Sequence, residues 1–130
     1  MNQISCRGTV RVALPPDEAI ELFTPEGERR WVADWDPSYP GGDEGVFLTG
    51  DTTWVTVARG ERSRRYARFT PGVQAGTVSV RCEPDGAGTV ATVGYQPTAL
   101  APEAAAQLAD FAAGYRDFLA GWEREIAARA

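Results

Sequence analysis

The hydrophobic period of the chain changes near residue 100, and this change constrains the fold more than any other feature. Between residues 44 and 98, short runs rich in β-branched and aromatic residues are separated by turn signals at roughly ten-residue intervals, as in an antiparallel meander. After Pro102 the large apolar residues recur every three or four positions, which is the period of one helix face. A sheet followed by a long amphipathic helix predicts an α+β domain. The apolar stripe of this helix consists of Leu108, Phe111, Tyr115, Phe118, Leu119, Trp122 and Ile126.

Alternation of apolar and polar residues predicts six strands. In the first, residues 4–14, the apolar side chains of Ile4, Cys6, Val10, Val12 and Leu14 share one side, and polar residues occupy the other. The remaining strands follow one another in the meander and are separated by turns rich in Gly, Pro and Asp. We expect them at residues 45–49, 52–59, 64–70, 76–83 and 89–98.

Two short helices are expected between the first strand and the meander. Consecutive prolines end the strand, and residues 17–23 begin with acids, which favour a helix N-terminus. Thr24 can cap a second helix and Pro25 suits its first position, so we expect this helix to run to about residue 33. The C-terminal helix should extend for about 25 residues, or roughly 37 Å.

The 130 residues fit a single domain, 1–130. No run of about 18 apolar residues could cross a bilayer, and the first ten residues lack the features of a signal peptide. Cys6 and Cys82 are too few for a disulfide framework, so we expect both to be reduced and packed as small apolar side chains. These features predict a cytoplasmic protein with no membrane insertion.

The net charge of −5 argues against nucleic acid and acidic membranes as partners, because both require a positive protein surface. All 13 cationic residues are arginines. Several lie within residues 59–65, where interleaved Gly, Ser and Glu favour a solvated hairpin tip over an anion site.

The chain has no histidine, the commonest general base and metal ligand. Its two cysteines are too far apart for a zinc-site spacing, and the glycines at 86–88 match no nucleotide-binding pattern. We therefore expect no metal and no cofactor. Any acid–base chemistry would have to use carboxylates, tyrosines or arginines.

Residues 25–40, PEGERRWVADWDPSYP, place Trp31, Trp35 and Tyr39 among charged residues and prolines. Burial of each large ring is worth roughly 1.5–3 kcal/mol, so something should cover these rings. Two interpretations are open: the segment forms a lid over a cavity, or its rings plug the end of the sheet and complete the core.

Four segments of the chain resemble the START-like, or SRPBCC, superfamily, and in particular a bacterial branch of uncharacterised members. The resemblance covers nearly the whole chain and implies the helix-grip fold, in which a curved six-stranded sheet wraps around the C-terminal helix. This superfamily includes lipid-transfer proteins, the birch-pollen-allergen group, polyketide cyclases and aromatases, and activators of a heat-shock chaperone, so the fold alone selects no function. The segments are LFTPEGERRWVADWDPSYP at 22–40, TTWVTVARG at 52–60, RRYARFTPGVQAGTVSVRCEPDGAGTVATVGY at 64–95 and LAPEAAAQLADFAAGYRDFLAGWE at 100–123.

The resemblance also implies a cavity between the sheet and the C-terminal helix, with the two short helices closing one end. In a ligand carrier this cavity should be closed, mainly apolar and several hundred Å³ in volume. For each aromatic residue the alternative is ordinary core packing, and a shift of one residue in a strand would turn its side chains outward. The candidate ligand-binding residues are Trp31, Trp35, Tyr39, Trp54, Tyr66, Arg68, Tyr95, Phe111, Tyr115 and Phe118.

Candidates for catalysis are fewer, and no catalytic residue is assigned. Arg68 and Tyr66 share a strand face at i, i+2, and if that face points inward they could anchor a carboxylate or enolate oxygen. Otherwise Arg68 would be solvated or paired with an acid. Asp34 and Asp36 flank a tryptophan and could act as acid or base, although Asp36 also begins an ordinary turn before proline.

Three functions remain open at this point. The leading hypothesis is a carrier or sensor that binds a small apolar or aromatic molecule. The first alternative is an enzyme similar to polyketide cyclases and aromatases, which should show at least two convergent polar side chains with perturbed pKa values. The second is a protein-interaction module similar to the chaperone activators, which should show a contiguous exposed apolar patch. An apolar sheet edge or the long helix could also support a homodimer.

Overall fold

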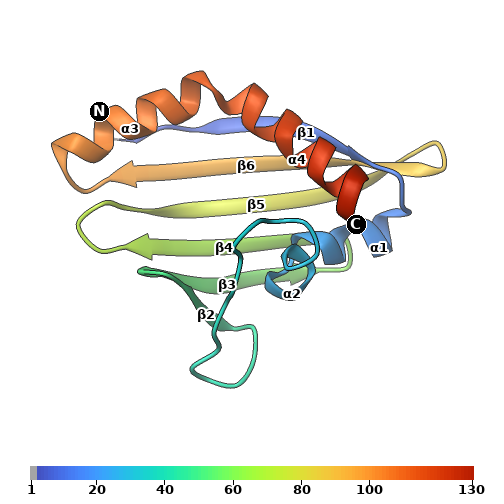
Figure 1. The fold of residues 1–130 in the computed structure, drawn as a ribbon, viewed down its shortest axis with the longest axis horizontal. Coiled ribbons are helices and arrows are strands. Elements are labelled where there is room, and N and C mark those ends of the chain that lie inside the picture. The colour runs from blue at the N-terminus through green and yellow to red at the C-terminus, as the bar shows by residue number, and fades with distance from the viewer. Residues whose placement is uncertain (1–2) are drawn as a thin grey trace.

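Six strands form one curved antiparallel sheet in the computed structural model, which describes residues 3–130, so residues 1 and 2 of the predicted domain lie outside the described residues. Their order across the sheet is β1-β6-β5-β4-β3-β2, so the first strand lies beside the last (Figure 1). The prediction of six strands is confirmed, and the ends differ from the expected ones by a few residues. The strands are β1 Cys6–Val12, β2 Val46–Thr49, β3 Thr52–Gly60, β4 Ser63–Thr70, β5 Gln74–Asp85 and β6 Gly88–Ala99.

The helices lie at the two ends of the sequence. After β1 come α1 (Pro16–Ala19), the 3-10 helix η1 (Ile20–Phe23) and α2 (Pro25–Glu28). At the C-terminus, α3 (Pro102–Ala113) and α4 (Tyr115–Arg129) form the long helix that the aromatic stripe predicts. Figure 1 shows this pair along the β1 and β6 side of the sheet, with α2 in front of the other half, while α1 contacts β5 and β6 near the end of α4.

The long helix is interrupted once, at Gly114, which the periodicity did not predict. Gly114 has φ −98° and ψ 10°, outside the helical region. Hydrogen bonding nevertheless continues through it, because its N–H donates to the Asp110 carbonyl and its own carbonyl accepts from the Phe118 N–H, both at 3.0 Å. The aromatic stripe therefore stays on one side of both helices.

Strand alternation decides which side chains face the helices. In β1, Cys6, Val10 and Val12 are buried, whereas Arg7 and Arg11 are exposed, as the sequence predicts. The buried side packs under α4, which lies over β1. Both cysteines are free thiols in the buried core. Within residues 3–130, no helix is both long enough and apolar enough to cross a membrane.

Helix α2 begins as predicted but ends early. The Thr24 hydroxyl accepts a hydrogen bond from the Gly27 N–H at 3.0 Å, which confirms the predicted cap. The helix stops at Glu28, and residues 29–34 form turns and bends, so the predicted extension to residue 33 is wrong. The physical reason is tertiary: the Trp31 indole turns back to donate to the Leu22 carbonyl at 2.8 Å. Asp34 then adopts a left-handed φ of 58°, which no helix continues.

Replacing Gly27 by alanine should destabilise the protein by about 2 kcal/mol or more. A Cβ at this position would lie 1.7 Å from the Glu21 carbonyl oxygen, so α2 would have to move away from η1. Thermal unfolding measures the loss. Gly41→Ala is the matched control, because a Cβ there has no atom within 4 Å. Equal melting temperatures for the two variants would contradict this packing of α2.

Candidate functional site

A small cavity, here called the inner cavity, lies between the sheet, α2 and α4. Cross-strand register places Tyr66, Val78 and Tyr95 in one row of the inner sheet face, and Trp54 and Arg68 in the neighbouring row. The inner cavity has a volume of about 20 Å³, which is room for about one water molecule. Its lining residues are Phe23, Glu28, Phe47, Trp54, Tyr66, Val78, Val80, Tyr95 and Trp122.

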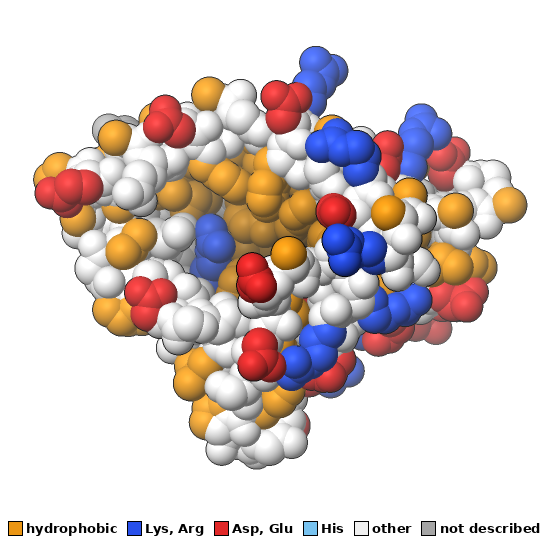
Figure 2. All heavy atoms as spheres, in the orientation of Figure 1, with side chains coloured by type: hydrophobic (Ala, Val, Ile, Leu, Met, Phe, Trp, Pro, Cys, Tyr) orange, Lys and Arg blue, Asp and Glu red, His pale blue; other side chains and the backbone are white. Residues whose placement is uncertain are grey.

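A wider space, the outer depression, adjoins the inner cavity at Trp122, which lines both. It has a volume of about 410 Å³ and opens to solvent between α4 and residues 31–33. Trp31, Phe118 and Trp122 supply its aromatic wall, and Arg124 and Glu125 add charge. Figure 2 shows a hollow on this face of the molecule in which hydrophobic side chains gather, with a basic side chain at its edge. The inner cavity and the outer depression are together called the hollow below.

Glu28 is the acidic residue that lines the inner cavity. It is the last residue of α2, is half-buried, and contributes to the lining of the inner cavity together with six aromatic residues. Among residues 3–130, no side chain pairs with this carboxyl or donates a hydrogen bond to it. Burial alone raises its pKa to about 8, because the charged form loses its hydration and gains no partner. The group can therefore change its protonation state close to neutral pH.

Arg68 is the cationic group beside the inner cavity. Its guanidinium lies 5.5 Å from the centre of the Trp54 ring and 5.1 Å from that of Tyr95, which are cation–π distances. One nitrogen donates to the Gln74 side-chain oxygen at 3.0 Å. Burial lowers the pKa of Arg68, although an arginine stays charged at any physiological pH. Within residues 3–130 it forms no ion pair, so its charge is held mainly by aromatic faces.

Two tyrosines complete the polar lining. The Tyr66 hydroxyl donates to the Phe23 carbonyl at 2.9 Å, so it is occupied by the protein itself. Tyr95 lies between the two charges: burial raises the pKa of its phenol, the nearby Glu28 raises it further, and Arg68 opposes the increase. Both phenols therefore stay protonated, and they can donate hydrogen bonds but cannot act as bases near neutral pH.

The structure sorts the ten candidate ligand-binding residues into groups. Trp54, Tyr66 and Tyr95 line the inner cavity, and Arg68 lies over two of these rings. Trp31 and Phe118 line the outer depression. Phe111 and Tyr115 pack against Tyr95, with ring centres 5.3 Å and 6.0 Å from it. The Tyr115 hydroxyl donates to the Val93 carbonyl at 2.7 Å, which fixes α4 on the sheet.

Trp35 and Tyr39 lie outside the lining of both spaces. Their rings pack on Phe47, 6.5 Å and 6.4 Å away, and the Trp35 indole donates to the Pro25 carbonyl at 2.8 Å. The Tyr39 hydroxyl bonds to the Glu26 carboxylate. Trp31 is 3% exposed, with its ring centre 5.2 Å from that of Trp122. The segment is thus bonded to α2 and η1 through its rings, while Trp31 also lines the outer depression.

The two aspartates considered as acids or bases do not reach the hollow lining. Asp36 pairs with Arg29 at 2.9 Å and its side chain is exposed. Asp34 is exposed at a left-handed turn position. Both residues therefore serve the turn that follows α2.

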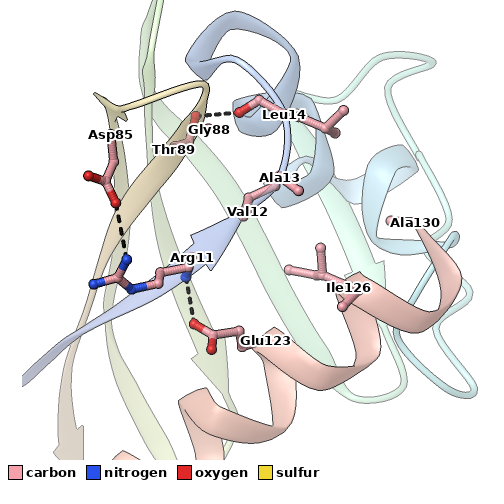
Figure 3. Close-up of a pocket in the computed structure, with 11 residues that line it drawn as sticks. Arg11, Val12, Ala13, Leu14, Asp85, Gly88, Thr89, Glu123, Ile126 and Ala130 are labelled. Carbon is pink, nitrogen blue, oxygen red and sulfur yellow. Dashed lines mark hydrogen bonds and ion pairs between the residues drawn. The ribbon is translucent and has the colours of Figure 1, made fainter.

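Another depression, of about 430 Å³, lies where β1, the β5–β6 turn and the end of α4 meet (Figure 3). Its polar groups are bonded to one another. The Arg11 N–H donates to the Glu123 carboxylate at 2.7 Å, the Arg11 guanidinium pairs with Asp85 at 3.3 Å, and Thr89 donates to the Leu14 carbonyl at 2.7 Å. Because these groups satisfy each other, we place the candidate site in the hollow, where Glu28 is unpaired.

In the part of the chain that the structure describes, the space between the sheet and the helix does not form the expected closed cavity of several hundred Å³. The enclosed space is about 20 Å³, because Phe23, Phe47 and Trp122 fill much of the interior. The larger volume belongs to the outer depression, which is open. The candidate site therefore consists of the small inner cavity, with Glu28 in its lining, and the open outer depression with its aromatic wall.

Glu28 was missed as a site residue, because acids in a first helical turn are ordinary. The sequence held one signal that could have found it. In a helix running to residue 33, as the sequence predicts, Glu28 would share one face with Trp31 and Val32, three and four positions later. That placement beside a large apolar ring was the available signal.

Comparisons with known proteins identify the fold. No family model matches the chain, and no curated protein sequence matches it significantly. CalU16 from Micromonospora echinospora is 20% identical, with a TM-score of 0.65 over 95% of this chain and 75% of that one. Ara h 8.0201 is 12% identical, with a TM-score of 0.68 over 98% of this chain and 99% of that one. The di-domain ARO/CYC protein BexL from the BE-7585A biosynthetic pathway is 16% identical, with a TM-score of 0.62 over 99% of this chain and 52% of that one.

At these identities the similarity establishes the architecture alone. The chain has the α+β helix-grip fold that its sequence predicts.

Replacing Glu28 by glutamine should change how stability depends on pH. The unfolded chain loses the Glu28 proton near pH 4.3, the ordinary value for glutamate, whereas the folded protein keeps it to about pH 8. Between these values the folded state binds more protons, so the free energy of unfolding falls as pH rises. Glutamine does not titrate, so the free energy of unfolding of Glu28→Gln should not fall in this way. Relative to the wild type it should rise by at most about 5 kcal/mol between pH 4.3 and pH 8. Urea unfolding at several pH values measures the difference, and parallel curves would show that the carboxyl is not buried.

Proposed function

We propose that the protein binds a small apolar or aromatic molecule in the hollow. The observation that carries this proposal is the aromatic wall of the outer depression, formed by Trp31, Phe118 and Trp122, of which Trp122 also lines the inner cavity. Apolar burial would supply affinity, and the few polar groups at the inner end would orient the ligand. The open depression suits a carrier or sensor that exchanges its ligand with solvent.

Other features support the proposal at a coarser level. Structures with the same fold include BexL, an ARO/CYC protein of a biosynthetic pathway. Both cysteines are buried free thiols, which suits a reducing compartment, so we propose a cytoplasmic location. The net charge of −5 favours neutral or cationic ligands over anionic ones.

Phe118→Lys should weaken ligand binding at least tenfold, because it places a charge in the wall of the outer depression. Native mass spectrometry of protein purified from its own organism would first identify a retained molecule. Titration of that molecule into wild type and variant then gives the two dissociation constants. Ala120→Lys is the matched control, since Ala120 is exposed on the same helix and lines neither space. Equal affinities for all three proteins, or no retained molecule, would contradict a binding role for the hollow.

The second candidate function is an enzyme similar to polyketide cyclases and aromatases. Glu28 and Arg68 favour it, because within residues 3–130 neither forms an ion pair and both act on the pKa of Tyr95. A carboxylate with a pKa near 8 suits a general base at neutral pH, and Arg68 could stabilise an enolate oxygen.

This enzymatic candidate makes a separate prediction. With a linear poly-β-ketone as substrate, Glu28→Gln should lower the rate of ring formation at least tenfold, while apolar ligands still bind. Product analysis by mass spectrometry measures the rate. An unchanged rate in Glu28→Gln, or a wild-type rate equal to that of the buffer control, would reject the enzyme and leave the carrier.

The third candidate function is a module that binds another protein. The outer face of β2–β4 carries exposed apolar side chains, Val46, Val55, Val57 and Phe69, which are 39–52% exposed. A partner or a second copy of the chain could bind there. No other feature of this face indicates which partner it would take, so the patch supports no more specific proposal.

A further inference from the structure

Glu28 differs from the other charged groups on the inner side of the sheet, because none of the residues 3–130 pairs with its carboxyl. Arg64 is buried, yet it pairs with Glu21 at 3.4 Å and donates to the Gly60 and Ser63 carbonyls at 2.7 Å and 2.8 Å. Arg68 has Gln74 and two aromatic faces. Within residues 3–130 the Glu28 carboxyl has neither a cation nor a hydrogen-bond donor. A carboxylate among aromatic side chains without a counter-charge is costly, so Glu28 keeps its proton to about pH 8, and a positively charged guest would stabilise the ionised form.

The walls around Glu28 also favour a cation. Six of the nine residues that line the inner cavity are aromatic. Aromatic faces are negative and attract cations, whereas they offer little to a neutral hydrogen-bond donor. Arg68 demonstrates the effect beside the same cavity, since its guanidinium rests on Trp54 and Tyr95. Carboxylate and rings together therefore select positive charge over a neutral polar group.

The volume of the inner cavity limits the size of the charged group. About 20 Å³ accommodates one water molecule. A primary ammonium group is close to water in size, whereas a trimethylammonium group is several times larger. The remainder of such a ligand would extend past Trp122 into the outer depression, whose 410 Å³ and aromatic wall suit an apolar body.

We propose that the ligand of the hollow is a primary amine with an apolar or aromatic body, and that its ammonium group binds at Glu28. This inference rests on the proposed function, because it assumes that the hollow binds a small molecule. It adds the chemical class of that molecule and the residue that selects it.

The experiment uses four probes that share a 2-naphthylethyl body and differ at one end: a primary amine, its trimethylammonium derivative, an alcohol and a methyl ketone. Isothermal titration at pH 8 gives their dissociation constants for the wild type. We expect the primary amine to bind at least tenfold more tightly than the other three probes. In Glu28→Gln this preference should fall to less than twofold, while the affinity for the alcohol stays within threefold of its wild-type value.

The control variant is Glu18→Gln, which removes the same charge from an exposed position of α1. It should keep the amine preference. Equal binding of all four probes, a preference for the ketone, or an amine preference that survives Glu28→Gln would overturn the amine inference and leave the proposed function intact. Failure of every probe to bind, together with no retained molecule in native mass spectrometry, would overturn both.

Discussion

The hollow exists because a single helix cannot cover a sheet of this width. Six strands about 4.8 Å apart span roughly 24 Å, whereas a helix with its side chains is about 10–12 Å across. The helices α3 and α4 lie over the β1 and β6 side, whereas η1 contacts β4 and β5, and α2 lies in front of the remaining strands (Figure 1). Tyr95 marks the junction, with its ring centre 5.3–6.3 Å from those of Phe111, Tyr115, Phe118 and Trp122. The seam between the two coverings is where the site lies.

Aromatic residues both build this seam and narrow it. Trp122 packs against Phe23 and Trp31, with ring centres 6.0 Å and 5.2 Å away, and so joins α4 to η1 and to the segment after α2. The same contacts reduce the enclosed space to the size of a water molecule. A ligand larger than that must therefore bind mainly in the outer depression or displace Trp122. The indoles of Trp31 and Trp35 are hydrogen-bonded to the backbone of η1 and α2. The segment that the sequence suggested as a lid is therefore held in place beside the hollow.

The electrostatics of the interior separate structural charges from candidate functional ones. Arg64 shows how this protein satisfies a buried charge for structure alone, with one acid and two carbonyls as partners. Glu28 has none of these within residues 3–130, and its pKa rises to about 8 as a result. Charged groups that stay unpaired in an apolar site cost stability, and such groups concentrate where proteins bind ligands or perform chemistry. This contrast is the reason for placing the site at Glu28 and not at the larger depression beside Arg11.

The amino-acid sequence by itself determined the architecture. The alternation in β1, the turn spacing of the meander and the aromatic stripe after Pro102 are local patterns, and each corresponds to one element of the α+β helix-grip fold. Strand parity also put Tyr66 and Arg68 on one face of their strand, and the register shows that Trp54 of the neighbouring strand pairs with Arg68 on that face. Only the tertiary structure decided that α2 stops at Glu28, that the helix breaks at Gly114 and that Trp31 fills the seam. Those outcomes depend on contacts between residues distant in sequence, and the burial that raises the pKa of Glu28 exists only after sheet, α2 and α4 have come together.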